Sequence, residues 1–255
     1  VMLFPQPLQA AKKAVKEYDG FIAYDAAHVL GLIAGGCFQD PLREGADVVT
    51  GSTHKTFPGP QGGLILSTKN LAEGVNNAVF PGLVSNHHLH RLAALAVALA
   101  EMKAFAKDYA RDTINNAKTL AKALHECGFH VLGRNKGFTE SHQVLLEVSG
   151  LGGGDTVAKK LESANIVSNK NLLPYDKLKN ALNPSGLRLG TQEVTRLGMG
   201  PSEMTAIAEL FKALLLEGKD PNQVALGVEK LVKDSQTVKY SFDSQPDAYR
   251  YFDLH

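Results

Sequence analysis

This chain of 255 residues contains few cysteines and has almost equal numbers of positive and negative side chains. Its two cysteines, Cys37 and Cys127, stand far apart without metal-ligand spacing, which favours a reducing compartment over a disulfide scaffold. Lys and Arg number 27 against 26 for Asp and Glu, so no basic field predicts binding to nucleic acid or to an anionic membrane. These features predict a cytoplasmic protein whose partners are small molecules or other subunits.

Long apolar runs are absent as well. No stretch reaches the length of a membrane span, and the first residues lack the apolar core of a signal peptide. Residues 6–18 already have the pattern of an amphipathic surface helix that leads into a strand. We therefore expect a soluble chain without a membrane partner, and we expect that the natural domain begins before Val1.

Short apolar runs that end in polar side chains predict neighbouring strands. Residues 21–24 end at Asp25, and after a glycine-punctuated crossover a second run, residues 47–50, ends shortly before Lys55, which predicts a parallel pair. The connection to the next run, residues 63–67, is too short for a helix and a parallel return, so that strand is expected to be antiparallel. The sheet is therefore mixed, and the acid and the lysine lie beyond carboxyl ends of strands, where open α/β sheets bind ligands.

The remaining chain predicts a long helical region and then a smaller domain. The pattern favours a buried helix over residues 86–110 and a second helix over residues 111–127, which ends at Gly128. Short strands then alternate with helices, which is typical of an α+β domain. The strands are predicted at 129–132, 142–148, 165–167 and 186–190, and the helices at 154–164, 201–217 and 222–234. We assign residues 1–110 to part of a large domain and residues 111–255 to a small C-terminal domain.

Asp25 and Lys55 are the candidate catalytic pair. Taken alone, a carboxylate that ends an apolar strand is equally consistent with a helix cap or a buried ion pair. With a lysine at the end of the neighbouring strand, it matches the two groups that pyridoxal phosphate requires, a carboxylate for the ring nitrogen and an amine for the aldehyde. The alternative reading of GSTHKT as a P-loop is disfavoured, because that motif needs glycine where His54 stands.

Four separated segments resemble the serine hydroxymethyltransferase family in their order and spacing. They read YDAAHVLGLIAGG, ADVVTGSTHKTFPGPQGGLIL, VFPGLVSNHHLH, and NIVSNKNLLP with SGLRLGTQEVTRLGM. The likeness extends from about Asp25 to about Gly218, and the NHHLH segment is similar to the archaeal branch. The resemblance implies an α/β protein of the fold-type I class of PLP-dependent transferases, with a mixed, mostly parallel sheet flanked by helices and a smaller C-terminal α+β domain. It also implies a homodimer.

The resemblance further implies a role for each cofactor residue. Lys55 would bond covalently to the aldehyde of pyridoxal 5'-phosphate, and Asp25 would pair with its ring nitrogen. His28 would contact the side of the ring that carries the hydroxyl, and Thr53 and His54 would line the cofactor. We therefore take Lys55, Asp25 and His28 as the candidate catalytic residues.

Later segments supply the other implied contacts. Gly82, in a Phe-Pro-Gly turn, would approach the cofactor phosphate of the partner subunit. Arg188 would bind the amino-acid carboxylate, and a guanidinium between two leucines of an apolar strand can hold a carboxylate through two parallel hydrogen bonds. Asn171, and with it Asn169, would contact the pterin ring, although asparagine-rich turns are also common without a ligand.

Three neighbouring histidines, His87, His88 and His90, raise the question of a metal site. They lack a second pair of ligands at a suitable distance, and adjacent histidines at the start of a helix point in different directions. We expect no metal there, and we expect these side chains to line a dimer interface or the mouth of the cofactor site.

The predicted function is hydroxymethyl transfer that interconverts serine and glycine with a reduced pterin carrier. The alternatives are a threonine aldolase or transaldolase, a catalytically incomplete fragment, and a scaffold without catalytic duty. The resemblance places the family's tyrosines, its acid/base glutamate, a phosphate-binding Ser/Gly loop and the histidine that stacks on the ring before Val1, so weak cofactor binding and slow turnover are expected. The sequence leaves open tetrahydrofolate or tetrahydromethanopterin as the carrier, and a dimer or a tetramer.

Overall fold

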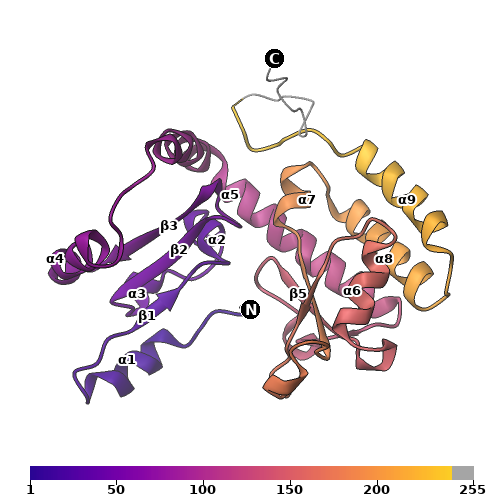
Figure 1. Cartoon of the computed structure of the whole chain (residues 1–255), viewed down its shortest axis with the longest axis horizontal. Coiled ribbons are helices and arrows are strands. Elements are labelled where there is room, and N and C mark those ends of the chain that lie inside the picture. Colours follow the sequence, from indigo (N-terminus) through magenta and orange to yellow (C-terminus); the bar gives the residue numbers. More distant parts are fainter. Residues whose placement is uncertain (243–255) are drawn as a thin grey trace. The chain divides into compact units, whose positions relative to one another are not determined.

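The computed structural model of the protein describes residues 1–242 and divides into two compact units, Val1–Arg111 and Asp112–His255. Each unit has its own β-sheet, and Figure 1 shows the first in indigo to purple and the second in pink to orange. Within residues 1–242, no helix is both long enough and apolar enough to cross a bilayer.

The first unit is built on a three-stranded sheet in the order β1-β2-β3. Its strands are β1 (Ala23–Asp25), β2 (Val48–His54) and β3 (Pro58–Ser67). β1 and β2 are parallel with Asp25 opposite Thr50, whereas β3 is antiparallel to β2. The structure therefore has the mixed sheet that the short connection predicts, although β2 is longer and β3 begins earlier than the apolar runs indicate.

Helices of the first unit lie against this sheet at points of close backbone approach. A Cβ added to Gly35, the C-cap of α2, would lie 2.4 Å from the carbonyl oxygen of Ala106, and one added to Gly59 would lie 3.3 Å from the Cβ of Ala98. Glycine at both positions lets the backbone pass next to the long helix α5. The helices are α1 (Leu8–Lys16), α2 (Leu30–Ala34), α3 (Pro41–Glu44), α4 (Ala72–Asn77) and α5 (Leu89–Glu126), with the short segments η1 (Lys69–Leu71) and η2 (Ala78–Leu83).

A single helix, α5, stands where the sequence predicts two. Neither Pro nor Gly occurs between Leu89 and Glu126, so nothing breaks the hydrogen-bond ladder near residue 110. The helix ends before Gly128, whose φ of 102° is the left-handed conformation expected after a helix. The prediction of a buried helix is wrong for its first turns, because Leu89 and Val97 are 69% and 59% exposed.

The second unit has a four-stranded antiparallel sheet in the order β4-β5-β7-β6, and Figure 1 shows β5 next to α6. Alternate side chains of β5 and β7, among them Leu146 and Leu187, join the helices in one core. The strands are β4 (His130–Val131), β5 (Gln143–Glu147), β6 (Asn169–Asn171) and β7 (Gly186–Gly190), and the helices are α6 (Gly154–Glu162), α7 (Gln192–Arg196), α8 (Pro201–Leu215) and α9 (Pro221–Lys233). Three short segments complete it: η3 (Arg134–Lys136), η4 (Ser149–Leu151) and η5 (Leu178–Asn180).

The third strand of this unit begins later than predicted. The sequence favours residues 165–167, but the strand is Asn169–Asn171. Asn165 has a left-handed φ of 61°, and the N–H of Ile166 donates to the carbonyl of Leu161 in the last turn of α6. Residues 165–167 therefore complete the exit from the helix instead of pairing with β7.

Candidate functional site

Asp25 and Lys55 lie at the carboxyl ends of two neighbouring parallel strands. Asp25 is the last residue of β1, and Lys55 comes directly after His54, the last residue of β2. Because the Cα of Asp25 lies opposite Thr50, Lys55 is five residues further along the same direction. Both residues are thus at the carboxyl-end edge of the parallel pair, which is the usual ligand edge of an α/β sheet.

Both side chains keep most of their bonding capacity. One oxygen of the exposed Asp25 carboxylate accepts the N–H of Ala27 at 2.9 Å. In the described part of the chain, Asp25 has no other partner, and the half-buried Lys55 has no hydrogen bond or ion pair. The acid and the amine are not bonded to each other, so each can bond to a ligand.

The backbone just after the lysine is held on two sides. The hydroxyl of the buried Thr56 donates to the carbonyl of His28 at 2.8 Å and accepts the N–H of Gly31 at 3.1 Å. The buried hydroxyl of Tyr109 donates to the carbonyl of Thr56 at 2.9 Å. Sequence reasoning missed these contacts, because no pattern links positions 53 residues apart.

The two residues that the resemblance assigns to the cofactor lining, Thr53 and His54, lie at the end of β2, where its pairing with β3 is irregular. Thr53 is buried, and its hydroxyl donates to the carbonyl of Pro60 at 2.7 Å. His54 is exposed, with Nδ1 3.3 Å from both backbone polar atoms of Gly62. Of the two, His54 has the side chain that solvent or a ligand can reach.

His28 and Gly82 lie in different parts of the first unit. The half-buried His28 is in the turn after β1, three residues beyond Asp25, where its carbonyl holds Thr56. Gly82 is exposed in η2, and a Cβ there would lie 2.9 Å from the carbonyl oxygen of Asn77. A glycine at this position therefore allows a close backbone contact within the turn.

Arg188 lies at the centre of the second sheet, in β7. Its neighbours Leu187 and Leu189 belong to the core, so Arg188 projects from the other face, on which Leu145 and Asn169 lie opposite it on the adjacent strands. Burial lowers the pKa of its guanidinium below the ordinary value. Within residues 1–242 this cation has no hydrogen bond or ion pair. A half-buried guanidinium without a partner is suited to an anionic ligand.

The asparagines share that face of the sheet. Asn169 is opposite Arg188 and exposed, and Asn171 is opposite Gly186 and half-buried. The Asn171 amide nitrogen donates to the carbonyl of Leu172 at 2.6 Å, which leaves the amide oxygen as an available acceptor. The structure thus brings the predicted carboxylate and pterin contacts together on one face.

The three histidines that precede or begin α5 are exposed. The rings of His88 and His90 meet edge to face, with centroids 5.7 Å apart. Among the described residues, no group of three metal-ligand side chains could hold an ion.

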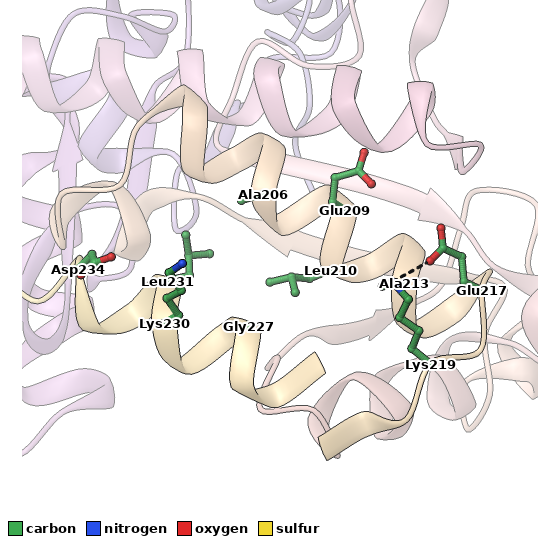
Figure 2. Close-up of a pocket in the computed structure, with 10 residues that line it drawn as sticks. All are labelled: Ala206, Glu209, Leu210, Ala213, Glu217, Lys219, Gly227, Lys230, Leu231 and Asp234. Atoms are coloured by element: carbon green, nitrogen blue, oxygen red, sulfur yellow. Dashed lines mark ion pairs between the residues drawn. The ribbon is translucent and has the colours of Figure 1, made fainter. Parts of the chain in front are cut away.

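A pocket of about 510 Å³ lies in the second unit between α8 and α9 (Figure 2). Leu210 and Leu231 face into it, and charged side chains surround the opening, with Lys219 and Glu217 paired at 3.2 Å. None of the predicted site residues is among its lining residues, which are Ala206, Glu209, Leu210, Ala213, Glu217, Lys219, Gly227, Lys230, Leu231 and Asp234.

A family model and the related sequences of known proteins agree on one family. The serine hydroxymethyltransferase family model matches residues 8–211. The serine hydroxymethyltransferase of Methanopyrus kandleri is 59% identical over 98% of this chain and 59% of its own length. That of Archaeoglobus fulgidus is 52% identical over all of this chain and 58% of its own. The chain therefore spans a little under three fifths of these archaeal relatives.

A solved structure gives the same fold. The L-threonine transaldolase from Pseudomonas fluorescens, in its internal aldimine state, superimposes with a TM-score of 0.85 and 35% identity, over 95% of this chain and 55% of its own. This likeness confirms the predicted fold class, fold-type I of the PLP-dependent enzymes. With a family model that matches most of its length and relatives above 50% identity, the chain belongs to the serine hydroxymethyltransferase family.

Proposed function

We propose that this chain carries the lysine and aspartate of a pyridoxal 5'-phosphate site in a protein that transfers a hydroxymethyl group between serine and a reduced pterin. The observation that carries the proposal is the placement of Asp25 and Lys55 at one edge of the first sheet, each without a charged partner in the described part of the chain. Family membership supports the same reading.

The residues present fit the cofactor by their chemistry. Pyridoxal phosphate supplies an electron sink for the bond that breaks at the amino-acid α-carbon. The free oxygen of Asp25 would accept a hydrogen bond from the protonated ring nitrogen, and the amine of Lys55 would bond to the aldehyde. His28, three residues after the acid, and His54, exposed at the end of β2, would contact the ring and its surroundings, whereas Thr53 would act through its contact with Pro60.

Arg188 is proposed to bind the substrate carboxylate. Its guanidinium is half-buried and has no anionic partner among residues 1–242, so a carboxylate would provide the missing hydrogen bonds. By fixing the carboxylate, the arginine would also orient the bonds of the α-carbon and so determine which of them breaks. Asn171, on the same face of that sheet, would bind an edge of the pterin, either tetrahydrofolate or tetrahydromethanopterin.

The proposed assembly is a homodimer in which Gly82 approaches the cofactor phosphate of the partner subunit. The exposed η2 turn supports this, because Gly82 presents backbone without a side chain. In this assignment residues 1–110 form part of the cofactor-binding large domain and residues 111–255 form the small domain.

A second candidate is transaldolase chemistry, in which an aldehyde takes the place of the pterin carrier. It is favoured by the TM-score of 0.85 to the threonine transaldolase. Both candidates would use the same lysine, aspartate and arginine, and they differ in the amino acid that is cleaved and in the acceptor that reacts with it.

A cofactor titration tests the proposal. Pyridoxal phosphate added to the purified chain should produce an absorbance band of protein-bound cofactor, and Lys55→Ala should abolish it. Lys69→Ala, which changes an exposed lysine in η1, is the matched control and should leave the band intact. An unchanged band in Lys55→Ala would refute the assignment of the lysine.

Product analysis separates the two candidate reactions. Serine cleavage that requires a reduced pterin indicates hydroxymethyl transfer. Exchange of the threonine side chain for an added aldehyde, without a pterin, indicates transaldolase activity. Serine cleavage at the same rate with and without pterin would contradict the first assignment.

A further inference from the structure

We infer that Tyr109 is a positioning residue for Lys55, a role that rests on the proposed function. Tyr109 lies on α5, 54 positions after the lysine in the sequence, yet its hydroxyl donates a 2.9 Å hydrogen bond to the carbonyl of Thr56. That carbonyl belongs to the residue directly after Lys55. The bond therefore restrains the backbone next to the proposed reactive amine.

Burial makes this bond hard to replace. The Tyr109 side chain is 1% exposed and Thr56 is 0% exposed, so water does not compete for either group. A buried phenol hydroxyl normally has a protein partner, because leaving it without one costs free energy. Loss of the Tyr109 hydroxyl would remove a partner from the Thr56 carbonyl at a site that solvent cannot reach.

The Thr56 side chain connects the same point to the segment after Asp25. Its hydroxyl donates to the carbonyl of His28 and accepts the N–H of Gly31. Gly31 is in tight contact, since a Cβ there would lie 2.2 Å from the Thr56 carbonyl oxygen. The segment that follows the acid and the segment that follows the lysine thus meet at Thr56, and Tyr109 holds that junction from α5.

The hydrogen bond from Tyr109 should affect the position of the Lys55 amine and not the rest of the cofactor site. A lysine side chain has four rotatable bonds, and Lys55 has no hydrogen bond to any residue from 1 to 242, so the position of its amine depends on its backbone. Fixing that backbone reduces the conformational freedom that is lost when the amine bonds to a ligand. Contacts that do not involve the amine should not depend on Tyr109.

Two cofactor forms distinguish this role from a general structural one. Pyridoxal 5'-phosphate has an aldehyde that can bond to Lys55, whereas pyridoxine 5'-phosphate has an alcohol in its place and cannot. Tyr109→Phe, which removes one hydroxyl and keeps the ring, should weaken binding of the aldehyde form roughly three- to tenfold, the equivalent of one neutral hydrogen bond. Its affinity for the alcohol form should stay that of the unaltered chain.

Tyr240→Phe is the matched control, because it also deletes one phenol hydroxyl, which here donates to Asp112 in the second unit. It should leave both affinities unchanged. If circular dichroism shows Tyr109→Phe to be partly unfolded, the titrations are repeated in trimethylamine N-oxide at a concentration that restores the signal of the unaltered chain.

The outcomes separate the inference from the proposed function. Equal weakening of both cofactor forms in Tyr109→Phe, or no weakening of the aldehyde form, would overturn the positioning role. If Lys55→Ala binds the aldehyde form as tightly as the unaltered chain does, the proposed function itself fails. If Lys55→Ala weakens it while Tyr109→Phe does not, only the inference fails.

Discussion

At the residue scale, the three charged side chains of the proposed roles share one feature. Asp25, Lys55 and Arg188 make no ion pair in the described part of the chain. By contrast, Asp47 is bonded to Lys12 at 2.6 Å, and Asp155 is bonded to both Lys159 and Lys170. The cofactor and the substrate carboxylate would supply partners for these three side chains.

Arg188 should show a conflict between stability and binding. Because burial lowers the pKa of its guanidinium without an anion to offset the cost, Arg188→Met should raise the free energy of unfolding, by at most about 1 kcal/mol for a half-exposed charge. The same change should abolish glycine binding measured by calorimetry.

Arg188→Lys is the companion variant. It keeps the charge but loses the planar fork, so glycine affinity should fall by roughly tenfold or more. Unchanged glycine affinity in both variants would show that Arg188 does not bind the carboxylate.

Sequence reasoning reached Asp25 and Lys55 because strand ends can be read from short apolar runs. It could not reach the Tyr109–Thr56 contact, since the two side chains belong to elements whose pairing depends on tertiary packing. It could not tell that Thr53 is buried and His54 exposed, because the pairing of β2 with β3 becomes irregular at these residues.

At the element scale, sequence patterns predicted some strands and helices correctly and misplaced others, depending on the local geometry of the chain. The antiparallel β3 was predictable because a short connection cannot return parallel. The sequence was divided into two helices because the residues become more polar near Arg111, where α5 passes from one unit to the other. Neither glycine nor proline breaks the helix there. The later start of β6 depends on the left-handed Asn165, which composition does not reveal.

The contact between α2 and α5 predicts a pair of glycine variants with opposite effects. Gly35→Ala should destabilise the chain by about 1–3 kcal/mol, because its Cβ would lie 2.4 Å from the Ala106 carbonyl oxygen. Gly74→Ala, in the exposed helix α4 with nothing near its Cβ, should stabilise it by about 0.5–1 kcal/mol. Urea unfolding measures both, and equal effects would contradict the close approach.

Asp176 connects the end of β6 to the start of β7 and predicts a pH dependence. Its carboxylate accepts hydrogen bonds from Ser185 and from the N–H of Leu173, and these bonds lower its pKa below 3.8. A carboxyl with a depressed folded-state pKa stabilises the fold above its unfolded-state value, and this contribution is lost as pH falls through the folded-state value.

Asp176→Asn should therefore be less stable than the unaltered chain at pH 7, and the difference should shrink as pH falls below 3.8. Urea unfolding across this range measures the change. Asp234→Asn, an exposed aspartate after α9, is the control and should show little difference at any pH. A difference for Asp176→Asn that stays constant down to low pH would show that its hydrogen bonds do not depend on the charge.

At the scale of the whole molecule, the residues with proposed roles are divided between the two units. The first unit has the lysine and the aspartate, and the second has Arg188 and the asparagines. The chain spans less than three fifths of the length of the Methanopyrus kandleri and Archaeoglobus fulgidus relatives. On the first unit, the apolar side chains of Leu89, Leu92 and Val97 in α5 are exposed.

The second unit should fold by itself. Its core residues all fall between Ala117 and Val224, and they close around one sheet face. A fragment of residues 112–242 is expected to unfold cooperatively on heating and to give well-dispersed amide resonances. A broad, non-cooperative transition would show that this core needs the first unit.

The central claim is that Asp25 and Lys55 bind opposite ends of one cofactor ring. It is tested most directly by the nitrogen NMR shift of ring-labelled pyridoxal phosphate bound to the chain, with reduction by borohydride and peptide mass spectrometry to identify the bonded lysine. The account predicts attachment at Lys55, a protonated ring nitrogen in the unaltered chain and loss of that protonated signal in Asp25→Asn. Attachment at another lysine, or an identical nitrogen shift with and without the Asp25 carboxylate, would contradict it.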